Sequence, residues 1–248
     1  MALLIIEIVL VSAALLFAGL VKGVTGMGFA SFALALATFV VGHRMALALS
    51  IIPSFASSLF LMATTPHLAE MSRRFWPMYA AILPGIAAGL WLLVRIDGHL
   101  AASVLGGVVV VYALFALSRP VLRLSRAWSD RLRAPIGVAH GLVNGLTGSQ
   151  LIPSLPYLLA CDLDPARFVQ TANILLTVSS LLMLAGLTQI GALTPAVALA
   201  GVAACAPTFA GVVAGSRIRD RLPVDTFRKI VLVLLVVLGG LLIARGLR

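Results

Sequence analysis

Hydrophobic residues run along this chain in long stretches that short polar segments interrupt. Five of these stretches contain no Asp, Glu, Lys or Arg, namely 45–65, 75–94, 100–118, 134–161 and 168–216. A helix needs about 20 apolar residues to cross a bilayer, so the last stretch is long enough for two crossings. Backbone groups inside a membrane must be hydrogen-bonded within the protein, which favours helices. The pattern therefore predicts an all-α polytopic membrane protein.

The apolar stretches divide into two sets of five segments. The first set lies at roughly 3–22, 29–41, 45–65, 75–94 and 100–118, and the second at roughly 134–144, 150–161, 168–187, 196–215 and 228–244. The second segment of each set has only about a dozen residues, which is too short to cross a bilayer alone. We expect each of these two segments to be half of a broken or re-entrant helix.

A sequence motif marks the same place in both sets. Residues 19–26 read Gly-Leu-Val-Lys-Gly-Val-Thr-Gly, and 122 residues later 141–148 read Gly-Leu-Val-Asn-Gly-Leu-Thr-Gly, with six of eight positions identical. The same offset aligns Ser57 and Ser58 with Ser179 and Ser180. We infer two copies of one unit, with a first membrane repeat at 1–118, a basic cytoplasmic linker at 119–133 and a second membrane repeat at 134–248.

The formal net charge of +10 is concentrated in short segments between apolar stretches. The two basic clusters are Arg119, Arg123, Arg126, Arg131 and Arg133, and then Arg217, Arg219, Arg221, Arg228 and Lys229. Such clusters follow the positive-inside rule for membrane proteins, so nucleic acid is not expected as a partner. If both clusters are cytoplasmic, corresponding helices of the two units run in opposite directions. The sequence therefore predicts two inverted-topology repeats, although Arg245 and Arg248 would then lie outside.

The glycine-rich end of each motif is the candidate binding site. Non-helical backbone at membrane depth is tolerated where it is buried in protein or lines a wet cavity, and glycine permits the turns that a break needs. New helices are expected to begin near Phe29 and Leu151. Their unpaired N–H groups and positive dipole ends would favour an anion near the bilayer midplane, between the two repeats.

Polar side chains around the two breaks support an anion site. Lys22 is a cation within an apolar segment, a position that usually has a functional role, and Asn144 stands at the equivalent place in the second motif. The predicted substrate-binding residues are Lys22, Thr25, Gly26, Met27, Gly28, Asn144, Thr147, Gly148, Ser149 and Gln150.

Structural roles are open alternatives for the same residues. Gly19, Gly23 and Gly26 also suit close packing of membrane helices. Lys22 could instead extend to the membrane interface. His140, one residue before the second motif, fits a hydrogen-bonded core histidine better than a proton carrier. Six further hydroxyl residues are expected to cap or bond neighbouring helices more than to line a path, namely Ser54, Ser57, Ser58, Thr177, Ser179 and Ser180.

The chain lacks the signatures of an enzyme or of an ATP-driven pump. Apart from Glu7, its acidic residues fall in the predicted loops, and no metal-binding spacing or phosphate loop is present. We therefore expect no catalytic residues, no metal site and no cofactor. The expected partners are a small anion and the lipid bilayer. A coupling ion (proton or sodium) and a homo-oligomer are left open, and the alternatives are an anion channel, a non-transporting scaffold and a membrane-embedded enzyme.

The duplicated glycine pattern resembles the TauE/SafE sulfite exporter family. The resemblance rests on residues 19–28, on 141–148 and on the continuation Leu155-Pro156-Tyr157-Leu158, and with the two-unit organisation it covers essentially the whole chain. It implies a multi-pass permease of the bacterial inner membrane that works without nucleotide hydrolysis. The substrate implied is sulfite, an organosulfonate or a related small anion such as a carboxylate.

Overall fold

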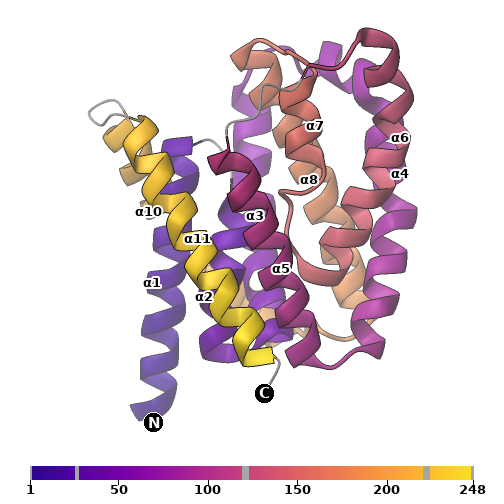
Figure 1. The fold of residues 1–248 in the computed structure, drawn as a ribbon. Helices are drawn as coiled ribbons and strands as arrows, with labels where there is room; N and C mark the ends of the chain where they lie inside the picture. Colours follow the sequence, from indigo (N-terminus) through magenta and orange to yellow (C-terminus); the bar gives the residue numbers. More distant parts are fainter. Residues whose placement is uncertain (1, 26–27, 119–122, 220–223, 247–248) are drawn as a thin grey trace.

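The chain forms a bundle of α-helices. A computed structural model describes residues 2–25, 28–118, 123–219 and 224–246, and these contain helices and turns but no β-strand (Figure 1). The helices are α1 (Ala2–Thr25), α2 (Phe29–Val41), α3 (His43–Thr64), α4 (Leu68–Arg95), α5 (Gly98–Leu117), α6 (Arg126–Thr147), α7 (Ser154–Ala160), α8 (Pro165–Gln189), α9 (Pro195–Ala203), α10 (Cys205–Arg219) and α11 (Val224–Gly246). Six segments within the described residues are long and apolar enough to cross a membrane. The predicted all-α polytopic membrane fold is confirmed.

Polar residues set where several helices begin. The side chains of Asp97, Ser125 and Asp164 each accept a hydrogen bond from a backbone N–H three residues ahead, which caps α5, α6 and α8. The cap at Ser125 starts α6 at Arg126, so residues 126–133, which we expected in the linker, form its first two turns. The division into two repeats and a linker stays a prediction.

Helices at the same position in the two halves run in opposite directions (Figure 1). The helix α1 rises in this view while α6 descends, and the pairs α3 and α8, and α5 and α11, are opposed in the same way. The closest helix pairs are reciprocal as well, because α1 packs on α10, α6 packs on α4, α3 packs on α8 and α5 packs on α11. These directions and contacts agree with two inverted repeats, which stay a prediction.

Glycines bring two of these helix pairs into close contact. A methyl group added at Gly23 of α1 would lie 2.3 Å from the carbonyl oxygen of Val212 on α10, and one added at Gly145 of α6 would lie 2.6 Å from that of Ile86 on α4. A methyl group at Gly19 would likewise lie 2.3 Å from the carbonyl oxygen of Thr208, so the interpretation of Gly19 and Gly23 as packing residues is right. Gly26, the third glycine of that interpretation, lies outside the described residues. Gly23 lies inside α1 and not in the break, which begins only after Thr25.

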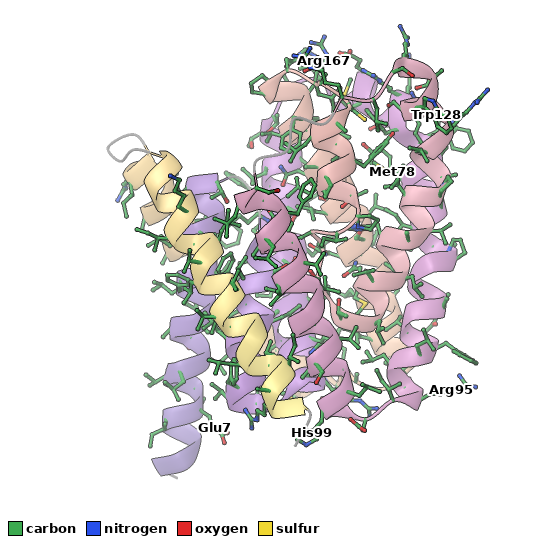
Figure 2. All side chains as sticks on the ribbon, in the orientation of Figure 1. Glu7, Met78, Arg95, His99, Trp128 and Arg167 are labelled. Atoms are coloured by element: carbon green, nitrogen blue, oxygen red, sulfur yellow. The ribbon has the colours of Figure 1, made fainter. Side chains whose placement is uncertain are left out.

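The two ends of the bundle differ in charge. Arg167 and Trp128 lie at one end, with the start of α6, the end of α10 and the start of α11, and we call this the basic end (Figures 1 and 2). Glu7, Arg95 and His99 lie at the opposite end (Figure 2). Arg245 also lies there and donates a hydrogen bond to the carbonyl oxygen of Phe39 at 3.0 Å. This hydrogen bond gives Arg245 a partner within the protein at the end opposite the basic end, where the positive-inside rule does not predict an arginine.

Candidate functional site

Both glycine motifs end a helix. The helix α1 stops at Thr25 and α2 starts at Phe29, preceded by Gly28 in the left-handed conformation (φ 89°). The helix α6 stops at Thr147, and Gly148 is also left-handed (φ 71°). The next helix, α7, begins at Ser154 and not near Leu151, so the second break is longer than expected. The predicted site residues Gly26 and Met27 lie outside the described residues.

Lys22 is held inside the protein by two serines. Its side chain is 2% exposed, and its Nζ donates to the hydroxyl oxygens of Ser57 and Ser58 on α3, at 2.9 Å each. Ser57 donates its own proton to the carbonyl oxygen of Pro53 at 2.7 Å, so its oxygen is left to accept from Lys22. No carboxylate of the described chain pairs with Lys22. The alternative in which Lys22 extends to the membrane interface is therefore wrong.

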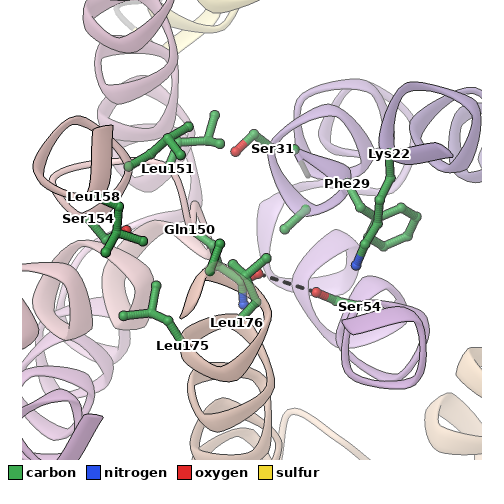
Figure 3. Close-up of a pocket in the computed structure, with 14 residues that line it drawn as sticks. Lys22, Phe29, Ser31, Ser54, Gln150, Leu151, Ser154, Leu158, Leu175 and Leu176 are labelled. Atoms are coloured by element: carbon green, nitrogen blue, oxygen red, sulfur yellow. Dashed lines mark hydrogen bonds between the residues drawn. The ribbon is translucent and has the colours of Figure 1, made fainter. Parts of the chain in front are cut away.

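Hydroxyl and amide groups link the second break to α3 and α8. Gln150 donates through Nε2 to the hydroxyl of Ser180 at 3.0 Å, and the hydroxyls of Ser54 and Ser180 lie 3.3 Å apart. Ser54 also donates to Oε1 of Gln150 at 3.5 Å (Figure 3). These groups form a polar cluster between the two halves of the chain.

Ser149 connects the same break to α2. Its hydroxyl lies 3.1 Å from that of Ser31, and both side chains are buried. Its backbone N–H donates to the hydroxyl of Thr147, which in turn donates to the carbonyl oxygen of Val143. Thr25 likewise donates to the carbonyl oxygen of Val21, one turn back in its own helix. The two motif threonines therefore bond to the ends of their own helices.

Asn144 and His140 are buried residues of α6, the helix that ends at the second break. His140 Nε2 lies 3.0 Å from the hydroxyl of Ser179, which fits the expected hydrogen-bonded core histidine. Asn144 is 1% exposed, and neither its Nδ2 nor its Oδ1 has a hydrogen-bond partner within the described protein. A buried amide in this condition costs about 1–3 kcal/mol unless a water or ligand completes its bonds.

A small cavity lies between the two halves. Among its walls are Lys22, Gly28, Ser31, Ser54 and Gln150, together with apolar side chains of α2, α7 and α8 (Figure 3). Its volume of about 20 Å³ holds roughly one water molecule. A larger cavity of about 260 Å³, which Thr25 also lines, shares Gly28, Leu151 and Leu155 as walls. The site is thus narrow in this conformation, and only a few side chains separate it from a larger space.

The first turn of α2 contributes backbone donors to this cavity. Phe29, Ala30 and Ser31 line it, and their N–H groups precede the first bond of the helix, which runs from Phe32 to Gly28. The N-cap residue Gly28 supplies no side-chain oxygen to these groups. A positive helix end and the ammonium group of Lys22 therefore face the same small space.

The structure places some of the predicted site residues around the cavity, together with serines that were not predicted. Lys22, Gly28 and Gln150 line the cavity, Ser149 reaches it through Ser31, and Asn144, Thr147 and Gly148 do not line it. The residues that the sequence prediction missed are serines: Ser31, Ser54, Ser57, Ser58 and Ser180. The repeated Ser-Ser pair at a constant offset was the signal that could have identified three of them.

Several apolar helices of membrane-spanning length, two interrupted helices and a buried cation define a multi-pass membrane protein of the transporter class. The model of the family "Sulfite exporter TauE/SafE" matches residues 11–242, so the chain belongs to that family. Members of this family are membrane transporters and not enzymes. No curated protein and no solved structure matches the chain.

Proposed function

We propose that the protein is a secondary transporter of a small anion, such as sulfite, an organosulfonate or a related carboxylate, in the bacterial inner membrane. The anion binds near the bilayer midplane, between two inverted repeats. The observation that carries this proposal is Lys22, a buried cation whose partners are two neutral hydroxyl groups.

The energetics of a buried lysine favour an anionic substrate. An uncompensated charge at the centre of a membrane helix costs about 2.5–3.5 kcal/mol on insertion scales, and such residues usually mark substrate or ion pathways. Serine hydroxyls solvate an ammonium group but do not neutralise it. An ammonium has three N–H groups, and two are occupied by Ser57 and Ser58. The third remains for an anion in the cavity that Lys22 lines.

The size of the cavity implies that the protein moves during transport. A space for one water cannot admit sulfite, so loading requires the walls to separate. Inverted repeats provide such a motion when one bundle tilts against the other around a central site. The glycine contacts make α1 with α10, and α4 with α6, suitable rigid units for this tilt.

A thermal-shift measurement on the purified protein in detergent tests the proposal. A ligand at 100 times its dissociation constant stabilises the folded state by about 2.7 kcal/mol. We expect sulfite, methanesulfonate or acetate to raise the melting temperature, and tetramethylammonium chloride, compared with sodium chloride, to leave it unchanged. Stabilisation by the organic cation with no response to any anion would contradict an anion site.

Flux into proteoliposomes separates a transporter from the channel and scaffold alternatives. We expect radiolabelled sulfite uptake that saturates with concentration. Unitary currents in planar bilayers would instead indicate a channel. The absence of both anion binding and flux in folded protein would favour a scaffold.

A further inference from the structure

An open groove lies at the basic end, between the first turns of α4 and α6 and away from the central cavity. Its volume is about 870 Å³, and its charged lining residues are Glu70, Arg73, Arg74, Arg126, Asp130 and Arg133. None of these residues lines the central cavity. The groove is therefore a separate site whose function does not follow from the transport proposal.

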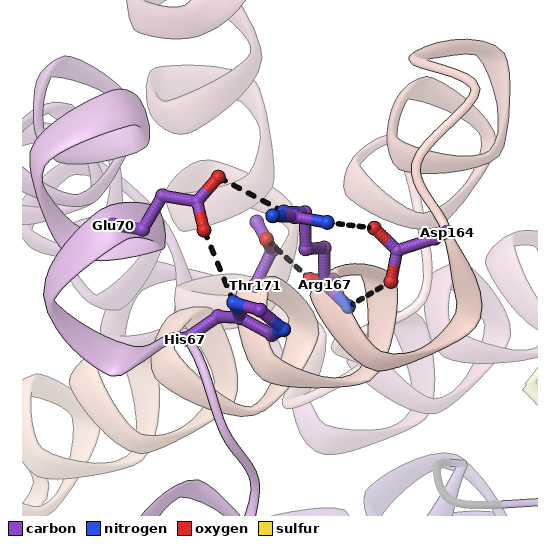
Figure 4. A network of polar contacts seen from close by, with 5 residues as sticks. All are labelled: His67, Glu70, Asp164, Arg167 and Thr171. Atoms are coloured by element: carbon purple, nitrogen blue, oxygen red, sulfur yellow. Dashed lines mark hydrogen bonds and ion pairs between the residues drawn. The ribbon is translucent and has the colours of Figure 1, made fainter.

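The two acidic residues that line the groove, Glu70 and Asp130, already have partners. Glu70 accepts from Nε of Arg167 at 2.9 Å and pairs with His67 at 3.1 Å, while Arg167 also binds Asp164 (Figure 4). The side-chain hydrogen bond from Arg167 holds the pKa of the Asp164 carboxyl below its usual value, so this carboxylate stays ionised at neutral pH. Within the groove, Asp130 is paired with Arg133.

Three groove arginines are left without such a partner. In the described structure, Arg73, Arg74 and Arg126 form no ion pair and no side-chain hydrogen bond. Their charges are added to the positive dipole ends of α4 and α6, which both begin at this groove. The groove thus carries positive charge that no group of the described protein neutralises.

Two guanidinium groups that line the groove lie near one buried aromatic ring. Arg74 from α4 lies 5.2 Å from the ring centre of Phe75, and Arg133 from α6 lies 5.3 Å from it. The Nε of Arg133 is buried and has no hydrogen-bond partner within the described residues. Two like charges near one buried ring, with an unused donor between the helices, favour an anion with several oxygen atoms.

We propose that this groove binds the phosphate of an anionic phospholipid headgroup. The groove opens at the end that the positive-inside rule places on the cytoplasmic face, where anionic lipids lie. Trp128, one turn into α6, is 56% exposed, and Arg131 lies over its ring at 5.8 Å. An exposed tryptophan at this level is typical of the lipid headgroup region. Arg73, Arg74 and Arg126 bind the phosphate oxygens, and the lipid ties the first turns of α4 and α6 together.

Thermal stability of the detergent-purified chain with added lipid tests this proposal. We expect phosphatidylglycerol in mixed micelles to raise the melting temperature, and phosphatidylcholine at the same molar ratio to leave it nearly unchanged. The effect should weaken as salt rises, because screening reduces attraction between exposed charges. Inorganic phosphate and glycerol 3-phosphate are tested separately, since they carry the same phosphate chemistry without acyl chains.

Charge-removing variants locate the effect. Arg126→Gln and Arg74→Gln should each lower the apparent affinity for phosphatidylglycerol about tenfold, since one charge-assisted bond contributes about 1.5 kcal/mol or more. The matched control is Arg95→Gln, which removes one charge at the opposite end, where Arg95 stacks on Trp91 at 3.6 Å. Arg126 is exposed at the start of α6, so its replacement leaves the fold intact.

Three results would overturn the proposal. Equal stabilisation by phosphatidylcholine would show a general lipid effect. A full response to inorganic phosphate alone would identify a soluble-anion site. An unchanged phosphatidylglycerol response in Arg126→Gln and Arg74→Gln would place the lipid elsewhere. Sulfite binding is measured on the same samples, so failure of the central site is seen separately from failure of the groove.

Discussion

Lys22 and Asn144 occupy the same place in the two motifs but have opposite surroundings. Both side chains are almost completely buried near the end of the first helix of their half. The side chain of Lys22 donates to Ser57 and Ser58, whereas the side-chain amide of Asn144 has no hydrogen-bond partner among the described residues. One position thus supplies a fixed cation, and the other supplies an unsatisfied neutral amide.

The partners of the repeated serines explain this difference. In the first half, the Ser57 and Ser58 hydroxyls both accept from Lys22. In the second half, Ser179 bonds to His140 and Ser180 bonds to Gln150, so neither reaches Asn144. Two similar frameworks therefore carry different polar networks. A small anion that lies between them would meet positive charge on one side only.

Lys22→Ala is the largest expected change to anion binding. A charge-assisted hydrogen bond contributes about 1.5–3 kcal/mol, so affinity for sulfite should fall roughly 10- to 100-fold. Stability without ligand should change little, because Ser57 keeps its bond to Pro53 and an uncompensated ammonium group is removed. Isothermal titration of folded, detergent-purified protein measures the affinity. Undiminished affinity would remove Lys22 from the site.

Alanine at the glycine that follows each of these residues tests whether the two halves share one packing scheme. The added methyl group of Gly23→Ala would meet α10 at 2.3 Å, and that of Gly145→Ala would meet α4 at 2.6 Å. Overpacking of this kind costs about 1–3 kcal/mol, so both variants should melt at lower temperature. Gly107→Ala is the control, because its methyl group meets nothing within 4 Å. Equal melting of all three variants would contradict the close helix contacts.

The sequence predicted the scaffold better than the site. Charge-free stretches and a repeated motif were enough to place the helices and to identify the breaks, because hydrophobic length and glycine act locally. The position of Ser31 and Ser54 against the second break depends on contacts between residues about 100 positions apart. Hydropathy does not encode such contacts. It also does not distinguish a glycine in a break from one in a helix contact, and only the contact of Gly23 with α10 shows which role this glycine has.

Asn144→Ala gives the smallest effect and shows whether the second half takes part in binding. Asn144 does not line the small central cavity, so we expect it to meet the anion only when the walls around the second break separate. A neutral hydrogen bond contributes about 1 kcal/mol, and sulfite affinity should fall roughly fivefold, less than for Lys22→Ala. Stability without ligand should be unchanged or slightly higher, because a buried amide without partners is removed. A loss of stability with unchanged affinity would instead mean that a structural water completes the bonds of Asn144.

The double variant Lys22→Ala with Asn144→Ala completes the comparison. If both side chains bind one anion, their effects on affinity should not be additive, since contacts to a shared partner couple.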